Sequence, residues 1–551
     1  MKFKCSTWQL SSTQLVAIVS FYFTVVLNIP FFRESFKLYE FTQTSADYFI
    51  YTMPLVLFVA LNIVLNILAL LIVHKIIIPL LLILGSAISY NSLFFNVYFD
   101  RNMLNNVLQT NVAESYRMLT PSYLAWLFCL GILPALVYLN IKIKYRKWYK
   151  EIAVRLATIF AASLVIGLIA SQYYQSYASF FRNHKYLTHL IVPSNFVGAT
   201  IGKIKRDRLA NQPFIKQAEQ VKMLKKDNYR TVSVIVVGET TRAANWGLSG
   251  YARQTTPKMA ARIAQGDNLF NFSEVTSCGT ATAVSVPCLF SSQTRKQYDE
   301  VIAKNQDNLI DILNRAGVKI VWIQNNSDSK NVADRIGEIN VFKGVESPLC
   351  VDGECQDNIM LPELDKALAE NPTQDLVVVL HTIGSHGPTY YERYTEAERL
   401  FTPTCDTNNI NKCSREELVN TYDNSVVYLD QFLDKVIERL EAHNEWKSSL
   451  YYFSDHGESL GEKGIYLHGT PYAFAPEEQT HIPMLLWFSP TWIKHKPFDL
   501  ACVRKNAAKA YSHDNVFHTV FSLMDIDMSK ASLPMYDEKL DMLAECAHKV
   551  E

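Results

Sequence analysis

The sequence predicts an α-helical membrane domain of five spans followed by an α/β domain whose central sheet is mostly parallel and covered by helices. Two observations lead to this fold class. Apolar runs dominate about the first 180 residues, whereas the remainder has the mixed composition of a globular protein. In that remainder, continuous β-branched runs alternate with amphipathic segments, which is typical of a parallel sheet buried on both faces. We expect the membrane domain at 1–175, a connector at 176–230 and the α/β domain at 231–551.

The composition of the chain names no partner by itself. Its 551 residues carry a formal net charge of zero. We expect no nucleic-acid partner, and we expect a monomer.

Five apolar stretches are long enough, as helices, to cross about 30 Å of hydrocarbon. The alternative, buried helices of a large soluble protein, is disfavoured because the stretches cluster at one end of the chain. A cleaved signal peptide is the alternative for the first stretch, but its apolar run is long and no small-residue cleavage site follows. The expected spans are 13–31, 48–73, 76–97, 121–141 and 151–173.

Basic residues set the expected orientation of these spans, because Lys and Arg in short loops favour the cytoplasm. Lys2 and Lys4 precede the first span, and His74 and Lys75 separate the second from the third. The connection after the fourth span carries Lys142, Lys144, Arg146, Lys147 and Lys150, and Arg155 follows near the beginning of the fifth span. With five spans and the N-terminus inside, the α/β domain lies outside, which is the periplasm for a multi-pass protein of a bacterial inner membrane.

Cysteine usage supports the same topology. Cys5 falls on the cytoplasmic side and Cys129 within a span, which leaves eight for the outer part. An even number of cysteines, mostly in close pairs on an oxidising side, indicates disulfides. Zinc–thiolate binding is the alternative, which the lack of paired C-x₂-C spacings disfavours. We predict neighbour pairing of Cys278 with Cys288, Cys350 with Cys355, Cys405 with Cys413, and Cys502 with Cys546.

Two polar segments adjoin the predicted spans. In an external excursion at 98–120, Asn106, Thr110 and Glu114 fall at i, i+4 and i+8, so they share one helical face at the outer membrane surface. These residues alone favour a plain solvated face. The connector at 176–230 is rich in Lys and Arg, which suits either a phosphate-rich membrane surface or an ordinary solvated linker.

Candidate metal ligands follow several of the predicted strands. In open α/β sheets, functional residues gather beyond the carboxyl ends of the strands. Glu239, His386, Asp455 and His456 come soon after such ends, and His468 lies in a later loop. Each alone fits a structural residue, but carboxylates and imidazoles together suit zinc better than magnesium or calcium. The predicted strands are 232–237, 318–323, 376–380, 450–453 and 482–488.

The turn SCGTATAVSVPC at 277–288 offers a fourth ligand. Its small residues allow the backbone to approach a bound group closely, and a following helix would present its N-terminus to a phosphoryl group. A hydroxyl there could be both ligand and nucleophile, since metal coordination lowers the pKa of the bound oxygen. On chemistry alone, Thr280, Thr282 and Ser285 all qualify.

Four motifs resemble those of the lipid A phosphoethanolamine transferases, a group within the alkaline phosphatase superfamily that includes the mobile colistin-resistance enzymes. The motifs are VVGET (236–240), SCGTATAVSVPC (277–288), HTIGSHGPTY (381–390) and SDHGESLGEKGIYLHG (454–469). The resemblance covers essentially the whole chain, including the five-span anchor. It implies that the outer domain is of alkaline phosphatase/sulfatase type and is a zinc-dependent catalytic domain.

The resemblance also implies roles for individual residues. Thr282, the second threonine of the CGTxT turn, would be the nucleophile and would hold one tightly bound Zn²⁺ with Glu239, Asp455 and His456. His386 and His468 would serve the transferred group or a second zinc ion. The implied substrate-binding residues are Asn106, Thr110, Glu114, Asn326, Ser327, Lys330 and Glu458, of which the first three would face the lipid substrates instead of plain solvent.

The implied reaction transfers phosphoethanolamine from phosphatidylethanolamine to a phosphate of lipid A through a covalent phosphoethanolamine–threonine intermediate. Diacylglycerol is released, and the added ammonium weakens the adsorption of cationic peptides such as polymyxin. The chain departs from the family in one respect. Some relatives carry a cysteine pair around the donor-site lysine, whereas Asp328 and Val332 stand around Lys330 here, which puts the rigidity of that loop in doubt.

Three alternatives stay open at this point. A sister transferase would act on another acceptor, such as the lipopolysaccharide core or a periplasmic glycan. A phosphodiesterase or sulfatase would use water, although sulfatases of this superfamily need Cys or Ser in a C/S-x-P-x-R context, and Ala283 and Val284 follow Thr282. A membrane-anchored binding module would need no nucleophile among metal-binding carboxylates.

Overall fold

The structure is a computed structural model that separates into two compact units, Met1–Asn211 and Gln212–Glu551. It describes residues 9–39, 41, 45–69, 74–100, 103–104, 107–108, 120–210, 213–224, 227–351, 353–496 and 498–547. The division between the two units falls at 211/212. The three-part division expected from the sequence stays a prediction. Asn106, Thr110 and Glu114 lie outside the described residues.

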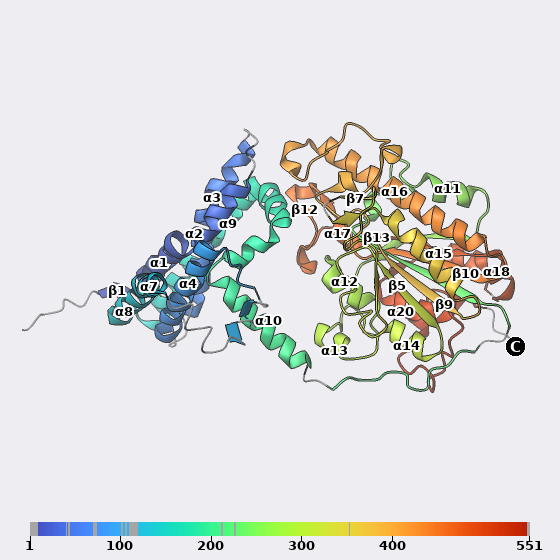
Figure 1. The fold of residues 1–551 in the computed structure, drawn as a ribbon, viewed down its shortest axis with the longest axis horizontal. Helices are drawn as coiled ribbons and strands as arrows, with labels where there is room; N and C mark the ends of the chain where they lie inside the picture. Colours follow the sequence, from blue (N-terminus) through green and yellow to red (C-terminus); the bar gives the residue numbers. More distant parts are fainter. Residues whose placement is uncertain are drawn as a thin grey trace, which may run out of the picture. The chain divides into compact units, whose positions relative to one another are not determined.

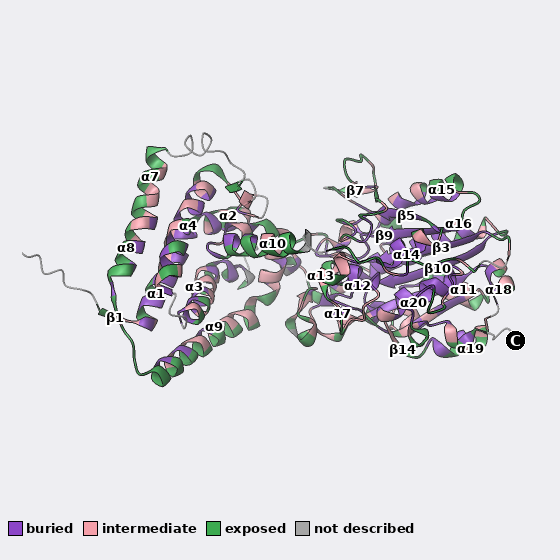
Figure 2. Cartoon of the chain, turned by 90° about the horizontal axis from the view of Figure 1, so that it is seen from below, coloured by how far each residue is buried: buried purple, intermediate pink, exposed green. Residues whose placement is uncertain are grey.

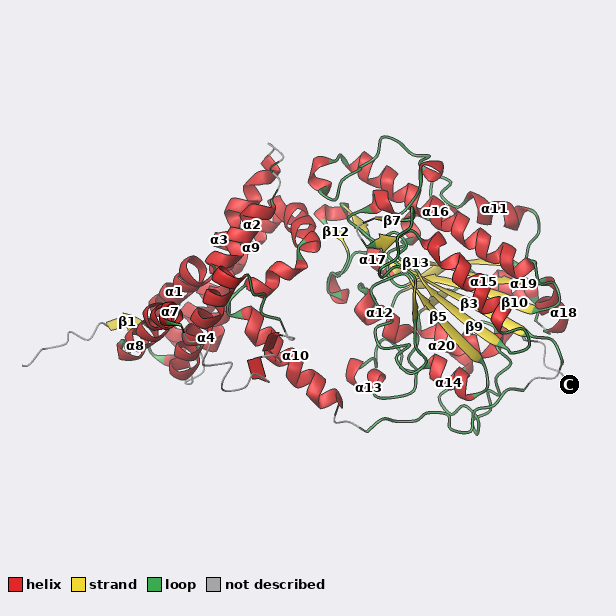
Figure 3. Cartoon of the chain, in the orientation of Figure 1, coloured by secondary structure: helices red, strands yellow, loops and turns green. Residues whose placement is uncertain are grey.

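The first unit is helical (Figure 3). Its first helix begins after the capping residue Ser11, whose side chain accepts a hydrogen bond from the N–H of Gln14. A short parallel pairing of β1 (Gln9–Ser11) with β2 (Lys142–Lys144) joins the beginning of the unit to its later part. The helices are α1 (Ser12–Tyr22), α2 (Ile29–Leu38), α3 (Tyr48–Leu68), α4 (His74–Phe95), α7 (Pro121–Leu127), α8 (Leu133–Asn140), α9 (Trp148–Asn183) and α10 (Ser194–Ala210).

Four helices of the described part are long and apolar enough to cross a membrane, namely Tyr48–Leu68, His74–Phe95, Pro121–Asn140 and Trp148–Asn183. The first predicted span corresponds to a bent pair, Ser12–Leu27 with Ile29–Leu38, whose two parts meet at 52°. A π-helical segment, Phe23–Leu27, precedes the bend, and Pro30 lies in the first turn after it. Counting the pair as one span gives the predicted five.

The second unit contains an eight-stranded sheet in the order β14-β4-β13-β10-β3-β9-β5-β6. β13 runs antiparallel to both of its neighbours, and the other pairings are parallel. The predicted class, a mostly parallel sheet, is therefore correct. The strands of this sheet are β3 (Thr231–Gly238), β4 (Leu269–Thr276), β5 (Lys319–Gln324), β6 (Ile339–Asn340), β9 (Leu376–His381), β10 (Lys447–Ser454), β13 (His481–Phe488) and β14 (Ala510–Ser512).

Every predicted strand run coincides with a strand of this sheet, whereas β4, β6 and β14 had not been predicted. The central strands β3, β9 and β10 are buried along their whole length, as Figure 2 shows. This full burial on both faces explains why their sequences are continuously apolar.

Helices cover both faces of the sheet (Figure 1). On one face, α12 (Thr282–Leu289), α14 (Leu309–Arg315) and α20 (Asp514–Leu523) share a continuous apolar core with the strands. On the other, α15 (Leu361–Glu370) and the long α16 (Arg415–Glu441) pack against the strands. The remaining helices are α11 (Pro257–Ala264), α13 (Glu300–Lys304), α17 (Glu477–Thr480), α18 (Pro490–His495) and α19 (Leu500–Asn506).

Candidate metal centre

Two adjacent strands bring three predicted ligands to one edge of the sheet. β3 and β10 are parallel neighbours, with Gly238 opposite Ser454 at their carboxyl ends. Glu239 and Asp455 are the next residues, so both emerge from the same edge, and His456 follows directly. The N–H of Asp455 donates to the carbonyl of Gly238 at 2.8 Å. The strand register therefore fixes the spacing of the two carboxylates.

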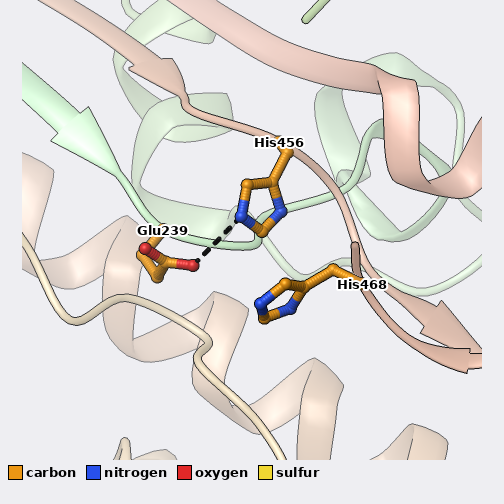
Figure 4. Close-up of side chains that lie close together, drawn as sticks. All are labelled: Glu239, His456 and His468. Carbon is orange, nitrogen blue, oxygen red and sulfur yellow. Dashed lines mark ion pairs between the residues drawn. The ribbon is translucent and has the colours of Figure 1, made fainter. Parts of the chain in front are cut away.

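The three side chains lie within ion-pair distance and are fully buried. His456 Nε2 is 3.4 Å from Glu239 Oε1 and 3.4 Å from Asp455 Oδ2. His468 joins the group, since one ligand atom each of Glu239, His456 and His468 lie within 4.8 Å of one another. Figure 4 shows these three side chains converging from different segments of the chain. The arrangement is a cluster of potential metal ligands.

The predicted nucleophile reaches this cluster. Thr282 is the first residue of α12, and its Oγ1 donates to Glu239 Oε2 at 2.9 Å and lies 3.4 Å from His456 Nε2. A disulfide between Cys278 and Cys288 ties the preceding turn to the helix. The hydroxyl of Thr280 points elsewhere, because its Oγ1 donates to the carbonyl of Thr470 at 2.6 Å. Packing thus brings the hydroxyl of Thr282, and not that of Thr280, to the cluster.

The buried carboxylates suit a cation. Glu239 Oε1 and Asp455 Oδ2 are buried and accept no hydrogen bond. Burial, and then the negative charge of Glu239, raises the pKa of the Asp455 carboxyl well above its ordinary value. Two facing carboxylates and an imidazole, with an alcohol beside them, form a mixed oxygen and nitrogen set of the kind that zinc prefers. The residues therefore fit the metal that the sequence predicts.

Two further histidines stand beside the cluster. The ring of His468 lies 4.4 Å from that of His456 and 5.6 Å from that of His386, between centroids. His468 Nδ1 lies 2.9 Å from Glu458 Oε2, a buried carboxylate that fixes the orientation of the ring. All of the predicted histidines are thus gathered at the same end of the sheet.

The predicted donor-binding segment begins inside the cluster and leads away from it. Asn326 Nδ2 donates to Glu239 Oε2 at 2.9 Å and to the carbonyl of Thr382 at 3.0 Å. Further along, Lys330 Nζ donates to Ser327 Oγ at 2.6 Å and pairs with Asp328 Oδ1 at 3.1 Å. Asn326 therefore orients the carboxylate of the candidate ligand Glu239, while Lys330 supplies a positive charge held by its own loop.

The residues that pack against the backbone of Glu239 were not identified from the sequence. Gly384 has φ of +51°, and a Cβ there would lie 2.5 Å from the carbonyl oxygen of Glu239, so only glycine fits. Asp357 accepts the N–H groups of Ile383 at 2.8 Å and Gly384 at 3.0 Å. Burial raises the pKa of this carboxyl to about 6. The glycine of the HTIGSHG motif was a signal, but Asp357 lies outside every motif.

A second missed contact comes from the long helix α16. Tyr422 donates its hydroxyl hydrogen to the carbonyl of Thr240 at 2.7 Å and accepts the N–H of Arg242 at 3.0 Å. The Arg242 guanidinium in turn donates to the carbonyl of Glu458 at 3.1 Å. These bonds connect the segment after β3 with the loop that carries Glu458. No local pattern in the sequence of α16 predicts that Tyr422 makes these hydrogen bonds.

The outer cysteines form four disulfides in the structure. The bonds are Cys278–Cys288, Cys350–Cys355, Cys405–Cys413 and Cys502–Cys546. These are the four neighbour pairs expected from the sequence. In the described part of the chain, Cys129 is a free thiol.

Comparison with known proteins assigns both units. The family model described as phosphoethanolamine transferase EptA/EptB matches residues 57–208, and the one described as sulfatase matches residues 231–526. Phosphoethanolamine transferase EptA of Escherichia coli (strain K12) is 40% identical over 516 residues, which are 93% of this chain and 93% of that protein. The chain belongs to the phosphoethanolamine transferases.

Two other members of this family support the same assignment. The integral membrane protein lipooligosaccharide phosphoethanolamine transferase A (EptA) from Neisseria meningitidis is 52% identical, with a TM-score of 0.65, over 98% of this chain and 100% of that chain. Phosphatidylethanolamine transferase Mcr-1 of Escherichia coli is 37% identical over 530 residues, 94% of this chain and 95% of that protein.

These matches confirm the predicted resemblance, the alkaline phosphatase/sulfatase type of the α/β domain and the predicted localisation. This phosphoethanolamine transferase is an integral inner-membrane protein whose catalytic domain is periplasmic.

Proposed function

We propose that this transferase moves phosphoethanolamine from phosphatidylethanolamine to a phosphate of lipid A, with Thr282 as the covalent carrier. One observation carries the proposal: Thr282 Oγ1 lies 2.9 Å from Glu239 Oε2 and 3.4 Å from His456 Nε2, inside a cluster of buried metal-type ligands. The names of relatives, which include a Kdo(2)-lipid A phosphoethanolamine 7''-transferase and a phosphatidylethanolamine transferase, support the choice of acceptor and donor.

In the first step, Thr282 Oγ attacks the phosphorus of phosphatidylethanolamine. The new bond joins Oγ to phosphorus, and the bond from phosphorus to the diacylglycerol oxygen breaks. The hydroxyl proton has an acceptor in place, since Glu239 Oε2 already receives its hydrogen bond at 2.9 Å. Phosphoethanolamine-threonine and diacylglycerol are the products of this half-reaction.

In the second step, a phosphate oxygen of lipid A attacks the phosphorus bound to Thr282. The bond from phosphorus to Oγ breaks, and the threonine alcohol is restored when Oγ takes back the proton that Glu239 received in the first step. We propose that His386 or His468, whose rings lie 5.6 Å apart, gives a proton to the diacylglycerol oxygen that leaves in the first step and regains one from the lipid A phosphate that attacks in the second. Glu458 holds His468 through Nδ1, which leaves Nε2 as the nitrogen for that transfer.

Glu239, Asp455, His456 and Thr282 would hold one Zn²⁺ in this site, with His468 and His386 available to a second. When bound, zinc would lower the pKa of the threonine alcohol and neutralise charge on the phosphoryl oxygens. Lys330 would add a positive charge on the donor side. Zinc as the metal is supported by the donor set itself, two carboxylates with imidazole.

The test is mass spectrometry of lipid A from cells that produce the wild-type chain, Thr282→Ala or Thr282→Ser. We expect added phosphoethanolamine with the wild-type chain, none with Thr282→Ala, and reduced addition with Thr282→Ser, because serine keeps the alcohol. Purified protein given phosphatidylethanolamine alone should release about one diacylglycerol per Thr282, since the first half-reaction needs no acceptor.

Three outcomes would contradict the proposal. Unmodified lipid A with labelled core or glycan would assign another acceptor. Continuous release of free phosphoethanolamine without transfer would mean that water is the acceptor. Equal polymyxin survival and equal lipid A modification with wild type and Thr282→Ala, at equal protein levels, would exclude Thr282 as the carrier.

A further inference from the structure

His513 lies between the two segments that meet in the metal centre. It follows β14 directly and caps α20, and its backbone N–H donates to the carbonyl of Thr276 at 3.0 Å. Its side chain, only 1% exposed, accepts the N–H of Cys278 at Nδ1, at 3.0 Å. Nε2 lies 2.9 Å from the carbonyl oxygen of Ser454. One ring therefore spans the gap between two main-chain segments.

The two segments are the ones whose separation matters for the reaction. Cys278 opens the turn that ends at Thr282, and Ser454 directly precedes Asp455 and His456. The disulfide from Cys278 runs to Cys288 in α12, so it ties the turn to its own helix and not to β10. The His513 ring adds a link between the turn and the end of β10, beside the contact of Thr282 Oγ1 with His456 Nε2.

The hydrogen-bond partners admit a single protonation state of the ring. The Cys278 N–H is a donor, so Nδ1 must offer its lone pair, and the Ser454 carbonyl is an acceptor, so Nε2 must carry the hydrogen. A cationic ring would turn a second N–H toward the N–H of Cys278. Burial, which lowers the pKa of His513 to about 3, favours the same neutral form.

We infer that His513 is a positioning residue of the transfer reaction, whose neutral ring sets the distance between the Thr282 turn and the Asp455–His456 strand end. The inference rests on the proposed function for its catalytic consequence, but the geometric role stands apart from the identity of donor and acceptor. Among the hydrogen bonds of the described residues, the His513 ring contacts none of the ligand side chains. Its effect passes through two main-chain contacts.

The magnitude follows from the precision that such a site needs. A displacement of about 1 Å of a reacting group is enough to lower turnover by about 10²-fold. Loss of a residue that orients a metal ligand lowers metal affinity by about 10–100-fold. Loss of a histidine with a merely structural role would lower the stability of the protein, but it would leave turnover and metal affinity unchanged in the folded molecules.

The same helix offers a matched control. His518 is 3% exposed and accepts a single main-chain N–H, that of Asp537, at 3.2 Å. Like His513 it is a buried neutral ring, since burial lowers its pKa to about 4. It has no contact with the turn or with β10 among the hydrogen bonds of the described residues. His513→Phe and His518→Phe therefore both replace a buried neutral ring, but the first removes the two hydrogen bonds that form the bridge and the second removes one hydrogen bond elsewhere.

The experiment compares full-length wild type, His513→Phe, His513→Gln and His518→Phe in detergent. We expect His513→Phe to lower kcat by about 10–100-fold with KM for phosphatidylethanolamine little changed, and to weaken Zn²⁺ binding, measured by chelator competition, by a similar factor. His518→Phe should leave kcat and Zn²⁺ affinity within about twofold. His513→Gln, whose amide both donates and accepts, should recover part of each.

Selective ¹⁵N labelling of histidine gives a readout that a structural role would not predict. The wild-type signal that is missing in His513→Phe should be that of a neutral ring with hydrogen on Nε2, unchanged between pH 6 and pH 8. A hydrogen on Nδ1, or a ring that titrates in this range, would overturn the inference.

So would wild-type kcat and Zn²⁺ affinity in folded His513→Phe. If His513→Phe does not fold, two results together would overturn the inference instead. These are full activity and full Zn²⁺ affinity of His513→Gln at pH 6–8, and a wild-type ring that carries its hydrogen on Nδ1. Absence of transfer by wild type, with the affinity differences intact, would refute the proposed function and leave the geometric role in place.

Discussion

The two ends of the central sheet bury charge in opposite ways. At the amino end, Lys447 pairs with Asp227 Oδ2 at 3.0 Å and with Asp525 Oδ2 at 2.9 Å, and Lys496 also pairs with Asp525. At the carboxyl end, the ion pairs of Glu239 and Asp455 among the described residues are with His456 alone.

The difference teaches how the fold separates stability from function. Lysines at the amino end neutralise their carboxylates permanently, so that end needs no ligand. At the carboxyl end two carboxylates face one another without lysine or arginine in the described ion pairs, and a buried charge of this kind is costly until a cation arrives. The following predictions test this contrast, in order of decreasing effect.

The largest effect is expected from Asp455→Asn. Loss of this carboxylate should lower the rate of phosphoethanolamine transfer by about 10³-fold or more, because the proposed metal ligand beside the proposed nucleophile is removed. The Tm of the metal-free protein should stay equal or rise, since one of two repelling carboxylates becomes a neutral amide of the same shape. Initial transfer rates and thermal unfolding with chelator present measure the two quantities. Retention of a tenth of the wild-type rate would contradict the assignment.

Asp525→Asn tests the opposite end. The substitution leaves Lys447 and Lys496 buried without their shared carboxylate, so the free energy of unfolding should fall by about 3–5 kcal/mol. Transfer per folded molecule should not change, because this end lies away from the reaction. Denaturant unfolding and rates normalised to folded protein are the measurements. As a control, Glu545→Gln breaks an exposed pair with Lys509 and should change the unfolding free energy far less. A loss of transfer in folded Asp525→Asn would break the proposed separation.

Removal of the metal should lower the Tm of wild type more than the Tm of Asp455→Asn, the variant that lacks one proposed ligand. A cation that binds only the folded state at a thousand times its Kd contributes about 4 kcal/mol. Chelator should therefore lower the Tm of wild type clearly, whereas the Tm of Asp455→Asn should respond much less. Restoring Zn²⁺ serves as the control for chelator effects. An equal response of both proteins would place the metal elsewhere.

The smallest effect concerns acid stability at the amino end. Burial alone would raise the pKa of Asp525, but pairing with Lys496 and Lys447 holds it below its ordinary value of 3.8. A lowered pKa contributes stability that is present above pH about 4 and is lost as pH falls through the folded pKa. Lys496→Met should raise this pKa and shift the acid loss of Tm to higher pH by less than about one unit. Tm between pH 3 and pH 6 measures it, and an unshifted curve would contradict the pairing.

Much of the fold could be predicted because its signals are local. The five spans, the strands β3, β5, β9, β10 and β13, and the cysteine pairs of short separation all follow from runs or spacings within a few residues. The antiparallel direction of β13 could not be predicted, since a fully buried strand is apolar throughout whichever way it runs. β4 was missed because its burial is only partial.

The candidate ligands Glu239, Asp455 and His456 could be predicted for a related reason. Each follows a buried parallel strand, and the carboxyl ends of parallel neighbours meet at one edge. Asp357, Tyr422 and His513 could not be found this way. Each acts through main-chain groups of segments far away in the sequence, and such a contact leaves no pattern near the residue itself.

The sequence by itself thus determined the kinds of groups present: a helical anchor, a parallel sheet, and carboxylates and imidazoles at strand ends. Tertiary structure decided which of several hydroxyls reaches them, Thr282 and not Thr280, and which buried histidine bridges the turn to β10. The physical reason is that residue type determines which reactions a side chain can take part in, whereas its contact with a partner depends on distances of tenths of an ångström. Such distances are set only when helices, turns and strands pack together.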